Sequence, residues 1–252
     1  MKTAIITGAS SGLGRELVRQ IESVFPEIEC CWLIARRENR LAALAQALPD
    51  RQVVCLPLDL CDPMSFMTLR EKLAADQPEV SLLINNAGCG YLGNIGESET
   101  STQTRMVDLN VRALTAVTNL VVPYMGSGGR ILNVSSIAAF CPTPRMTVYS
   151  AGKAYVSAYT VGAAEELRSK GITVTAVCPA PMKTEFLNVG NIAGNSRMFE
   201  RLPYCDQVQV AGGALRAARA GRTIYTPRLF YKFYRALAKV TPVKLMVKFT
   251  KT

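Results

Sequence analysis

The sequence predicts a single doubly wound α/β domain, in which helices cover both faces of a parallel sheet. Short apolar, β-branched runs alternate along the chain with longer stretches of helical periodicity, which is typical of βαβ units. A chain of 252 residues, 49% of them hydrophobic, can also bury a large core. We therefore expect one sheet of seven strands, at 3–7, 29–35, 52–56, 81–85, 130–135, 173–178 and 223–226.

Helical periodicity fills the intervals between these strands. The helix expected at 14–25 has one apolar stripe, and the helix expected at 63–75 begins with Pro63, which suits a first helical turn. The stretch 179–206 has no clear periodicity and is too long for an ordinary connection. Because it follows the carboxyl end of a strand, we expect it to act as a lid over a substrate.

Composition excludes several kinds of chemistry. The sequence contains no histidine, which rules out Ser-His-Asp and Cys-His nucleophile systems and removes the commonest metal ligand. The eight cysteines are scattered without metal-ligand or CxxC spacing, so we interpret them as reduced core residues and expect no metal site. No charged leader with an apolar run precedes the first strand, so we expect neither a signal nor a transit peptide and a cytoplasmic location.

A glycine-rich turn joins the first predicted strand to the first helix. Glycine lets the backbone turn tightly and approach a pyrophosphate, whose charge a helix N-terminus stabilises. The spacing GxxxGxG also occurs in purely structural turns, so the turn alone leaves both interpretations open. The candidate cofactor contacts in it are Gly8, Ser10, Ser11, Gly12, Leu13 and Gly14.

Arginines follow the second predicted strand, where a dinucleotide site meets the adenosine ribose. An acidic residue there would accept the 2′-hydroxyl of NAD, whereas arginine pairs with the 2′-phosphate of NADP. The strand end offers Arg36, Arg37 and Arg40 and no acid, which favours NADP(H). If a helix begins here, Arg36 and Arg40 are expected on one face; a solvated basic helix start is the alternative.

Tyr149 and Lys153 lie four residues apart in a predicted helix, so they share one helix face, about 6 Å apart along the axis. A phenol has a reference pKa near 10, and a neighbouring ammonium with an oxidised nicotinamide would lower that pKa. Ser136, after the fifth strand, can hydrogen-bond to a substrate oxygen as charge develops on it. The YxxxK spacing alone is also common in structural helices.

Together these motifs resemble the short-chain dehydrogenase/reductase family over residues 1 to about 227. The matching runs are TGASSGLG (7–14), LDL (58–60), NNAG (85–88), the asparagine of DLNV (Asn110), NVSS (133–136), YSAGK (149–153) and CPAPMKT (178–184). The resemblance implies a Rossmann-type sheet of strand order 3-2-1-4-5-6-7 and a catalytic set of Asn110, Ser136, Tyr149 and Lys153, with Asn110 holding a water that links Lys153 to solvent. One departure is Ala180, where the family usually has glycine.

The resemblance also implies an oxidoreductase that transfers a hydride between NADP(H) and a carbonyl or hydroxyl group, and we expect a homo-oligomer. Tyr149 and Lys153 would contact the cofactor, together with Asp59, Leu60, Asn86, Ala87, Gly88, Pro179, Met182 and Thr184. Candidate pocket residues are mostly apolar, which favours a lipophilic substrate such as a steroid or fatty-acyl carbonyl: Ile137, Ala138, Phe140, Pro142, Phe186 and Leu187. The alternatives are epimerisation with a recycled cofactor and a weakly catalytic NADP(H)-binding sensor or scaffold.

The end of the chain is basic and amphipathic. No acidic residue follows Asp206, and ten basic residues there account for the net charge of +10. At 100° per residue one side of a helix is apolar (Leu229, Phe230, Phe233, Tyr234, Leu237 and Val240), and the other side is basic (Arg228, Lys232, Arg235 and Lys239).

We therefore expect an oxidoreductase domain at 1–227 and a helical extension at 228–252, which Pro242 interrupts. Two uses of the extension stay open. Its apolar strip packs on the domain or on a sister subunit, or it lies on an anionic membrane as a peripheral contact. No nucleic-acid module accompanies the charge, so we expect no nucleic-acid partner.

Overall fold

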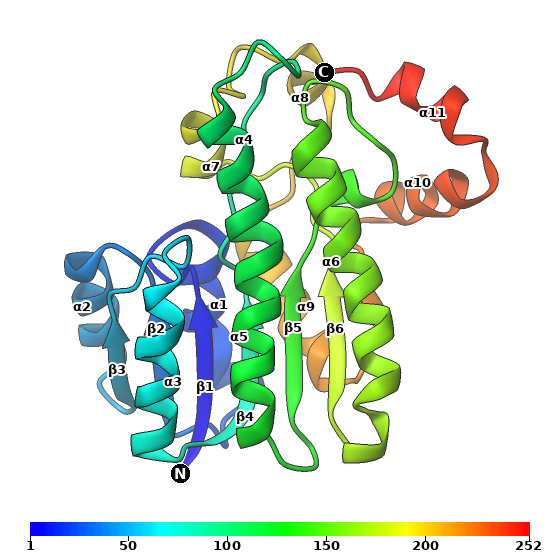
Figure 1. Ribbon diagram of the computed structural model, residues 1–252. Coiled ribbons are helices and arrows are strands. Elements are labelled where there is room, and N and C mark those ends of the chain that lie inside the picture. Colours follow the sequence, from blue (N-terminus) through cyan, green and yellow to red (C-terminus); the bar gives the residue numbers. More distant parts are fainter.

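The computed structural model describes residues 1–252, except for the side chain of Arg197. Seven parallel strands form one sheet in the order β3-β2-β1-β4-β5-β6-β7, so the predicted fold and strand order are confirmed (Figure 1). The strands are β1 Lys2–Thr7, β2 Cys30–Ile34, β3 Gln52–Leu56, β4 Glu79–Asn85, β5 Arg130–Val134, β6 Thr173–Val177 and β7 Ile224–Tyr225.

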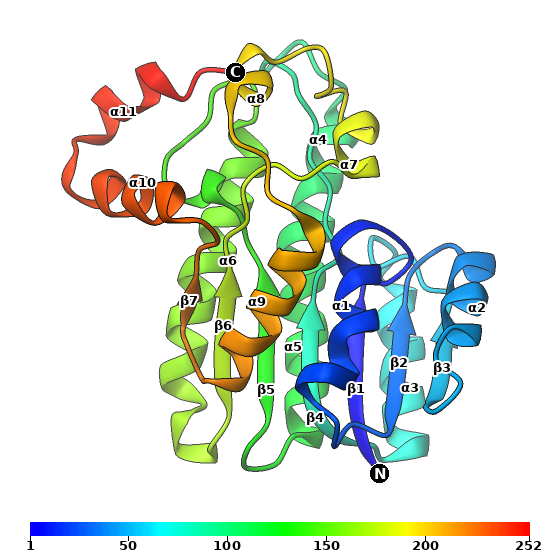
Figure 2. The ribbon, with the colours of Figure 1, turned by 180° about the vertical axis from the view of Figure 1, so that it is seen from behind.

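Helices cover both faces of the sheet, as Figures 1 and 2 show from opposite sides. The helices that form these layers are α1 Gly12–Val24, α2 Glu38–Gln46 and α9 Gln207–Arg219 on one face, and α3 Met64–Asp76, α5 Ala113–Val121 and α6 Thr147–Glu166 on the other. The predicted helix at 14–25 begins two residues early, inside the glycine turn. The helix α3 begins at Met64, one residue later than predicted, so Pro63 directly precedes it instead of forming its first residue.

Successive side chains of the inner strands enter different halves of the core. In β1, Ile6 packs among the residues of α1 and α9, whereas Ile5 packs among those of α3 and α5. Because helices cover both faces, these strands read as continuous apolar runs rather than as alternating ones. This burial on both sides explains why the strands were recognisable in the sequence.

A buried polar ladder ties two helices to the middle of the sheet. The Asn85 side-chain amide of β4 donates to Asn133 Oδ1 of β5 over 2.9 Å, and Asn133 Nδ2 donates to Thr160 Oγ1 of α6 over 3.0 Å. Asn85 Nδ2 also donates to Thr118 Oγ1 of α5. Hydrogen bonds of this kind are costly to leave unmade in a core, so they fix α6 against the sheet.

Further short helices lie beyond the carboxyl ends of the strands. The predicted lid at 179–206 contains α7 Glu185–Val189 and α8 Arg197–Arg201, and α4 Thr100–Val107 lies beside it (Figure 1). The extension forms α10 Leu229–Val240 and α11 Val243–Phe249, which begins directly after Pro242. In the chain as described, no helix combines the length and the apolar character needed to cross a membrane.

The extension is anchored to the domain by only part of its predicted apolar strip. Tyr231, which lay outside that strip, is the most buried residue of α10, and its hydroxyl donates to Pro203 O over 2.7 Å. Tyr234 packs beside Phe140, with ring centres 6.2 Å apart. After α11, Thr250 Oγ1 donates to Pro142 O over 2.8 Å.

Candidate active site

A cleft of about 410 Å³ lies at the carboxyl ends of the strands. Every predicted cofactor and catalytic residue lines it, apart from Arg40 and Asn110. The glycine turn, the ends of β2, β3 and β4, and the start of α6 therefore meet in one place, although they are far apart in the sequence. This is the position at which open α/β sheets bind ligands.

The glycine turn needs its glycines for close packing. Gly8 has a φ of +67°, and a Cβ at this position would lie 2.7 Å from Asn86 Nδ2. That amide nitrogen donates to Thr7 O over 3.1 Å and to Gly8 O over 3.0 Å, so Asn86 braces the turn from the neighbouring strand end. Ser11 precedes α1 without a side-chain cap, which leaves the first turn of this helix open toward the cleft.

The arginines at the ribose end have different partners. The helix α2 begins at Glu38, so Arg36 and Arg37 precede it. Arg37 and Arg40 both pair with Glu185 of α7, over 2.9 Å and 2.6 Å. The condition for Arg36 and Arg40 to share a helix face is therefore not met, because Arg36 precedes the helix and points toward Asp59, with 4.0 Å between Nη1 and Oδ2.

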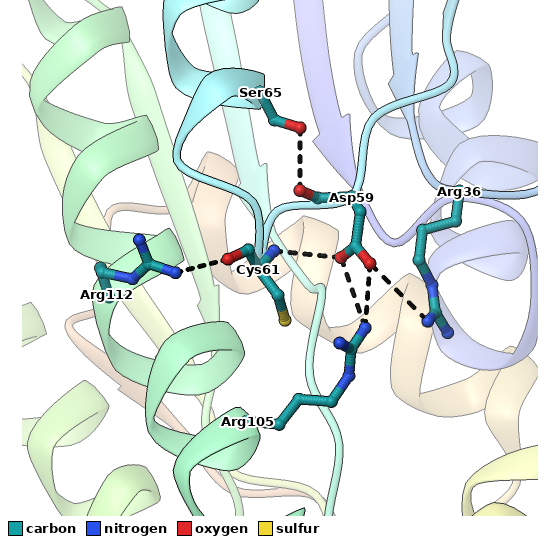
Figure 3. Close-up of polar contacts among 6 residues, drawn as sticks. All are labelled: Arg36, Asp59, Cys61, Ser65, Arg105 and Arg112. Atoms are coloured by element: carbon teal, nitrogen blue, oxygen red, sulfur yellow. Dashed lines mark hydrogen bonds and ion pairs between the residues drawn. The ribbon is translucent and has the colours of Figure 1, made fainter. Parts of the chain in front are cut away.

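Arg105 and the Cys61 N–H lie closer to the Asp59 carboxylate than Arg36 does (Figure 3). Its carboxylate accepts hydrogen bonds from Arg105 Nη2 over 3.0 Å and from the Cys61 N–H over 3.0 Å. Burial opposes ionisation here, but these two donors hold the pKa of Asp59 below its usual value. Since Arg105 already pairs with this carboxylate, the exposed guanidinium of Arg36 can pair with another anion.

The catalytic end of the cleft is buried. Tyr149 and Lys153 project from the first turns of α6, and the Lys153 Nζ lies 5.8 Å from the centre of the Tyr149 ring. This Nζ donates to Val134 O, at the end of β5, over 2.8 Å. Ser136 begins a short 3₁₀ turn, in which its Oγ accepts a hydrogen bond from the Ala138 N–H over 3.1 Å.

Burial dominates the ionisation of both groups in the protein alone. It raises the pKa of Tyr149 to about 12, although a hydrogen bond with Ser136 partly opposes the rise. Burial also lowers the pKa of Lys153 to about 8. Without the nicotinamide ring, the pKa of Tyr149 is therefore raised rather than lowered, because desolvation of the phenol is the largest effect on it.

Asn110 lies beneath the cleft rather than in its lining. Its side chain exchanges two hydrogen bonds with the backbone of Cys89, over 2.8 Å and 2.9 Å, from a π-helical turn at Asp108–Arg112. Such turns are frequent at functional sites. A Cβ on Gly88 would lie 2.8 Å from Asn110 Oδ1 and 3.3 Å from Lys153 Nζ, so this glycine allows both side chains to approach one another.

The far wall of the cleft is apolar. Of the predicted pocket residues, Phe140 and Pro142 do not line it, whereas the other four do. The sequence analysis missed further lining residues from α6, α8 and the extension: Met146, Phe199, Phe230, Tyr234 and Phe249. The aromatic content of the extension was a usable signal, but nothing local indicated which side faces the cleft. The departure at Ala180 is buried without a left-handed φ, so alanine fits there without strain.

Comparison with known proteins agrees with this geometry. Residues 2–191 match the family model described as short chain dehydrogenase. The chain is similar to sulfoacetaldehyde reductase 2 of Chromohalobacter salexigens, with 33% identity over 190 residues that cover 72% of this chain and 73% of the relative.

Solved structures give the same result over nearly the whole chain. A short-chain dehydrogenase from Sphingobium yanoikuyae in complex with NADPH is 28% identical with a TM-score of 0.80, covering 96% of this chain and 97% of its own. The bulky-bulky ketone specific alcohol dehydrogenase from Comamonas testosteroni is 26% identical with a TM-score of 0.75, covering 96% and 95%. The chain therefore belongs to the short chain dehydrogenase family of oxidoreductases.

Proposed function

We propose that this protein is an NADP(H)-dependent oxidoreductase that interconverts a carbonyl and a secondary hydroxyl group on a lipophilic substrate. The observation that carries the proposal is a single cleft in which the glycine turn, the Tyr149–Lys153 pair and an apolar wall are continuous. Bound NADP(H) would supply the hydride, while the chain's own residues bind, orient and move the proton.

Tyr149 is the proton donor in the direction of carbonyl reduction. Its pKa of about 12 keeps the phenol protonated at neutral pH, which is the state that can donate. Ser136 lies beside the phenol and stabilises charge on the same substrate oxygen. In the direction of alcohol oxidation, the Lys153 ammonium supports the phenolate that must accept the proton.

The other end of the cleft suits an anionic dinucleotide with a 2′-phosphate. The uncapped first turn of α1 offers backbone N–H groups to a pyrophosphate. Arg36 and Arg37 line the cleft directly beyond the end of β2, whereas the next residue, Glu38, does not line it. Arginine at this position pairs with a 2′-phosphate. Both features favour NADP(H) over NAD(H).

A lipophilic substrate follows from the wall opposite the catalytic pair. Phe186 packs against Tyr149 with ring centres 5.5 Å apart, and most of the remaining lining there is aliphatic or aromatic, with Thr143 and Thr250 among it. A sugar would leave its hydroxyl groups without partners on such a wall, at a cost of roughly 1–3 kcal/mol for each one buried. The similar structure from Comamonas testosteroni, whose name specifies bulky ketones, supports a ketone as the carbonyl substrate.

Turnover assays with NADPH and NADH test the proposal over a panel of lipophilic ketones, the matching secondary alcohols and sugars, with products identified by mass spectrometry. We expect NADPH consumption coupled to alcohol formation on apolar ketones and little turnover of sugars. A folded protein that binds NADPH but converts no carbonyl or alcohol would instead be a cofactor-binding sensor, and the proposal would be wrong.

A further inference from the structure

The extension has one anchored side and one unpartnered side. Tyr231, Tyr234 and Ala238 turn toward the domain, and Tyr231 is only 1% exposed. The neighbouring side of α10 is open to solvent, with Phe233 at 72% and Val240 at 80% exposure. These apolar side chains are therefore not used in the folding of the domain.

We call this open side, with the adjoining residues of α11, the tail face. Its apolar members are Phe230, Phe233, Leu237, Val240, Val243, Leu245 and Phe249. Its basic members are Lys232, Lys239, Lys244 and Lys248, all exposed. Figures 1 and 2 show that α10 and α11 stand away from the sheet beside its β7 edge, so the tail face is accessible.

The positive charge of the tail face favours an anionic partner. Residues 1–206 hold all 19 acidic residues and the 29 − 10 = 19 basic residues that remain, so the net charge of +10 lies after Asp206. None of the four lysines pairs with a described carboxylate. A two-fold dimer through the tail face would bring the lysines of both copies into one interface that has no acidic member, which is unfavourable.

An anionic lipid surface suits both the apolar side chains and the unpaired lysines of the tail face. Apolar side chains enter the boundary between headgroups and acyl chains, while lysines beside them meet lipid phosphates and carboxylates. Phe230 and Phe249 belong both to the tail face and to the lining of the cleft, so the opening of the cleft borders this surface. A lipophilic molecule could pass from the lipid to the cleft without crossing water.

We propose that the tail face docks this protein peripherally on anionic membranes, with the mouth of the cleft beside the lipid. The proposal goes beyond the catalytic function and does not depend on it, because docking requires neither cofactor nor turnover. It assigns a purpose to apolar and basic side chains that neither the core nor the cleft chemistry uses.

Co-sedimentation of the full chain with vesicles tests the proposal, without cofactor or substrate. Phosphatidylcholine vesicles are compared with phosphatidylcholine–phosphatidylserine vesicles, at low and high salt. The wild type should bind the anionic vesicles at least tenfold more strongly than the neutral ones, and salt should weaken the binding, since each basic residue near the surface contributes several-fold.

Two double variants and one control sharpen the test. Lys232→Gln with Lys239→Gln, and separately Phe233→Ser with Val240→Ser, should each reduce partitioning at least tenfold. Met67→Ser with Val161→Ser changes two exposed apolar residues outside the extension and should bind as the wild type does. Circular dichroism and NADPH binding check that all variants are folded.

Three outcomes would overturn the proposal. The wild type could fail to bind anionic vesicles, or the tail-face variants could bind them as well as the wild type does. The third outcome is a dimer in analytical ultracentrifugation that the tail-face variants lose, without any vesicle binding. That result would identify a second copy of the chain as the partner, and all three leave the proposed catalytic function untouched.

Discussion

The two ends of the cleft recognise their ligands by different physical means. At the catalytic end, Tyr149 is 8% exposed and Lys153 is 5% exposed, so desolvation controls their ionisation. At the ribose end, the side chain of Arg36 is 64% exposed, and Arg37 and Arg40 pair with a carboxylate that is itself in water. Burial therefore controls ionisation at the catalytic end, while under the proposed function exposed charge at the ribose end selects the cofactor.

This contrast predicts unequal consequences for mutation. A buried group that acts in the transition state cannot be replaced by solvent, so its loss should be severe and insensitive to salt. An exposed ion pair is screened by salt and contributes little, so changes at the ribose end should be graded and weaker at high ionic strength.

The largest effect is expected for Tyr149→Phe. Losing the hydroxyl removes the proton donor but keeps the ring that packs on Phe186, so kcat should fall by about 10²–10⁴-fold while NADPH affinity stays nearly unchanged. Steady-state kinetics and fluorescence titration measure the two quantities. Tyr155→Phe, on the same helix, is the control, because that hydroxyl bonds to Thr115 outside the cleft. Near-normal turnover by folded Tyr149→Phe would remove this tyrosine from the mechanism.

The buried ammonium should appear in the pH dependence of stability. The pKa of Lys153 is about 8 in the folded chain against 10.5 for a lysine in water, so between these values the unfolded chain binds more protons. The stability contributed by Lys153 is therefore fully present above pH 10.5 and is lost as the pH falls through 8. Lys153→Met removes this dependence.

Denaturant unfolding of the protein without cofactor, at a series of pH values, measures this pH dependence of stability. The free energy of unfolding of Lys153→Met, minus that of the wild type, should fall by about 3 kcal/mol as the pH rises from 7.5 to 10.5. Lys170→Met, at an exposed position, should show no such change. If the two variants follow the same pH course, Lys153 is not buried as a charged group.

Cofactor preference provides a test of the exposed end. Replacing Arg36 and Arg37 with serine should lower kcat/KM for NADPH at least tenfold and leave the value for NADH nearly unchanged, since charge-assisted contacts are worth roughly 1.5–3 kcal/mol before screening by solvent. High salt should shrink the difference. Arg70→Ser, at an exposed position of α3, is the control. An unchanged NADPH to NADH ratio would mean that neither arginine reads the 2′-phosphate.

Local sequence information predicted what depends on neighbours in the chain. The inner strands are recognisable because their residues are buried on both faces, and the Tyr149–Lys153 pair needs only helical geometry to share a face. The partners of Arg37 and Arg40 could not be predicted in this way. Glu185 lies 148 and 145 residues further along the chain, and only the fold brings it to them.

The extension illustrates the same limit. Helical periodicity correctly predicted that 228–252 is helical and amphipathic, but it did not identify the side that meets the domain. Tyr231 became the anchor because its hydroxyl meets Pro203 O, a contact that no pattern within the helix encodes. The π-helical turn around Asn110 likewise had no signal in the sequence.

The smallest effect, and the one of opposite sign, is expected for Glu185→Gln. In the cofactor-free chain, Arg37 and Arg40 lower the pKa of Glu185, so its carboxylate is ionised and must be displaced before a phosphate can use these arginines. Removing its charge should strengthen NADPH binding by about two- to fivefold, as exposed ion pairs are weak, with no change for NADH. Isothermal titration at low and high salt measures both affinities. The control is Glu165→Gln, which removes an exposed pair with Arg168 that does not line the cleft. Weaker NADPH binding by Glu185→Gln would show instead that this residue holds the lid over the bound cofactor.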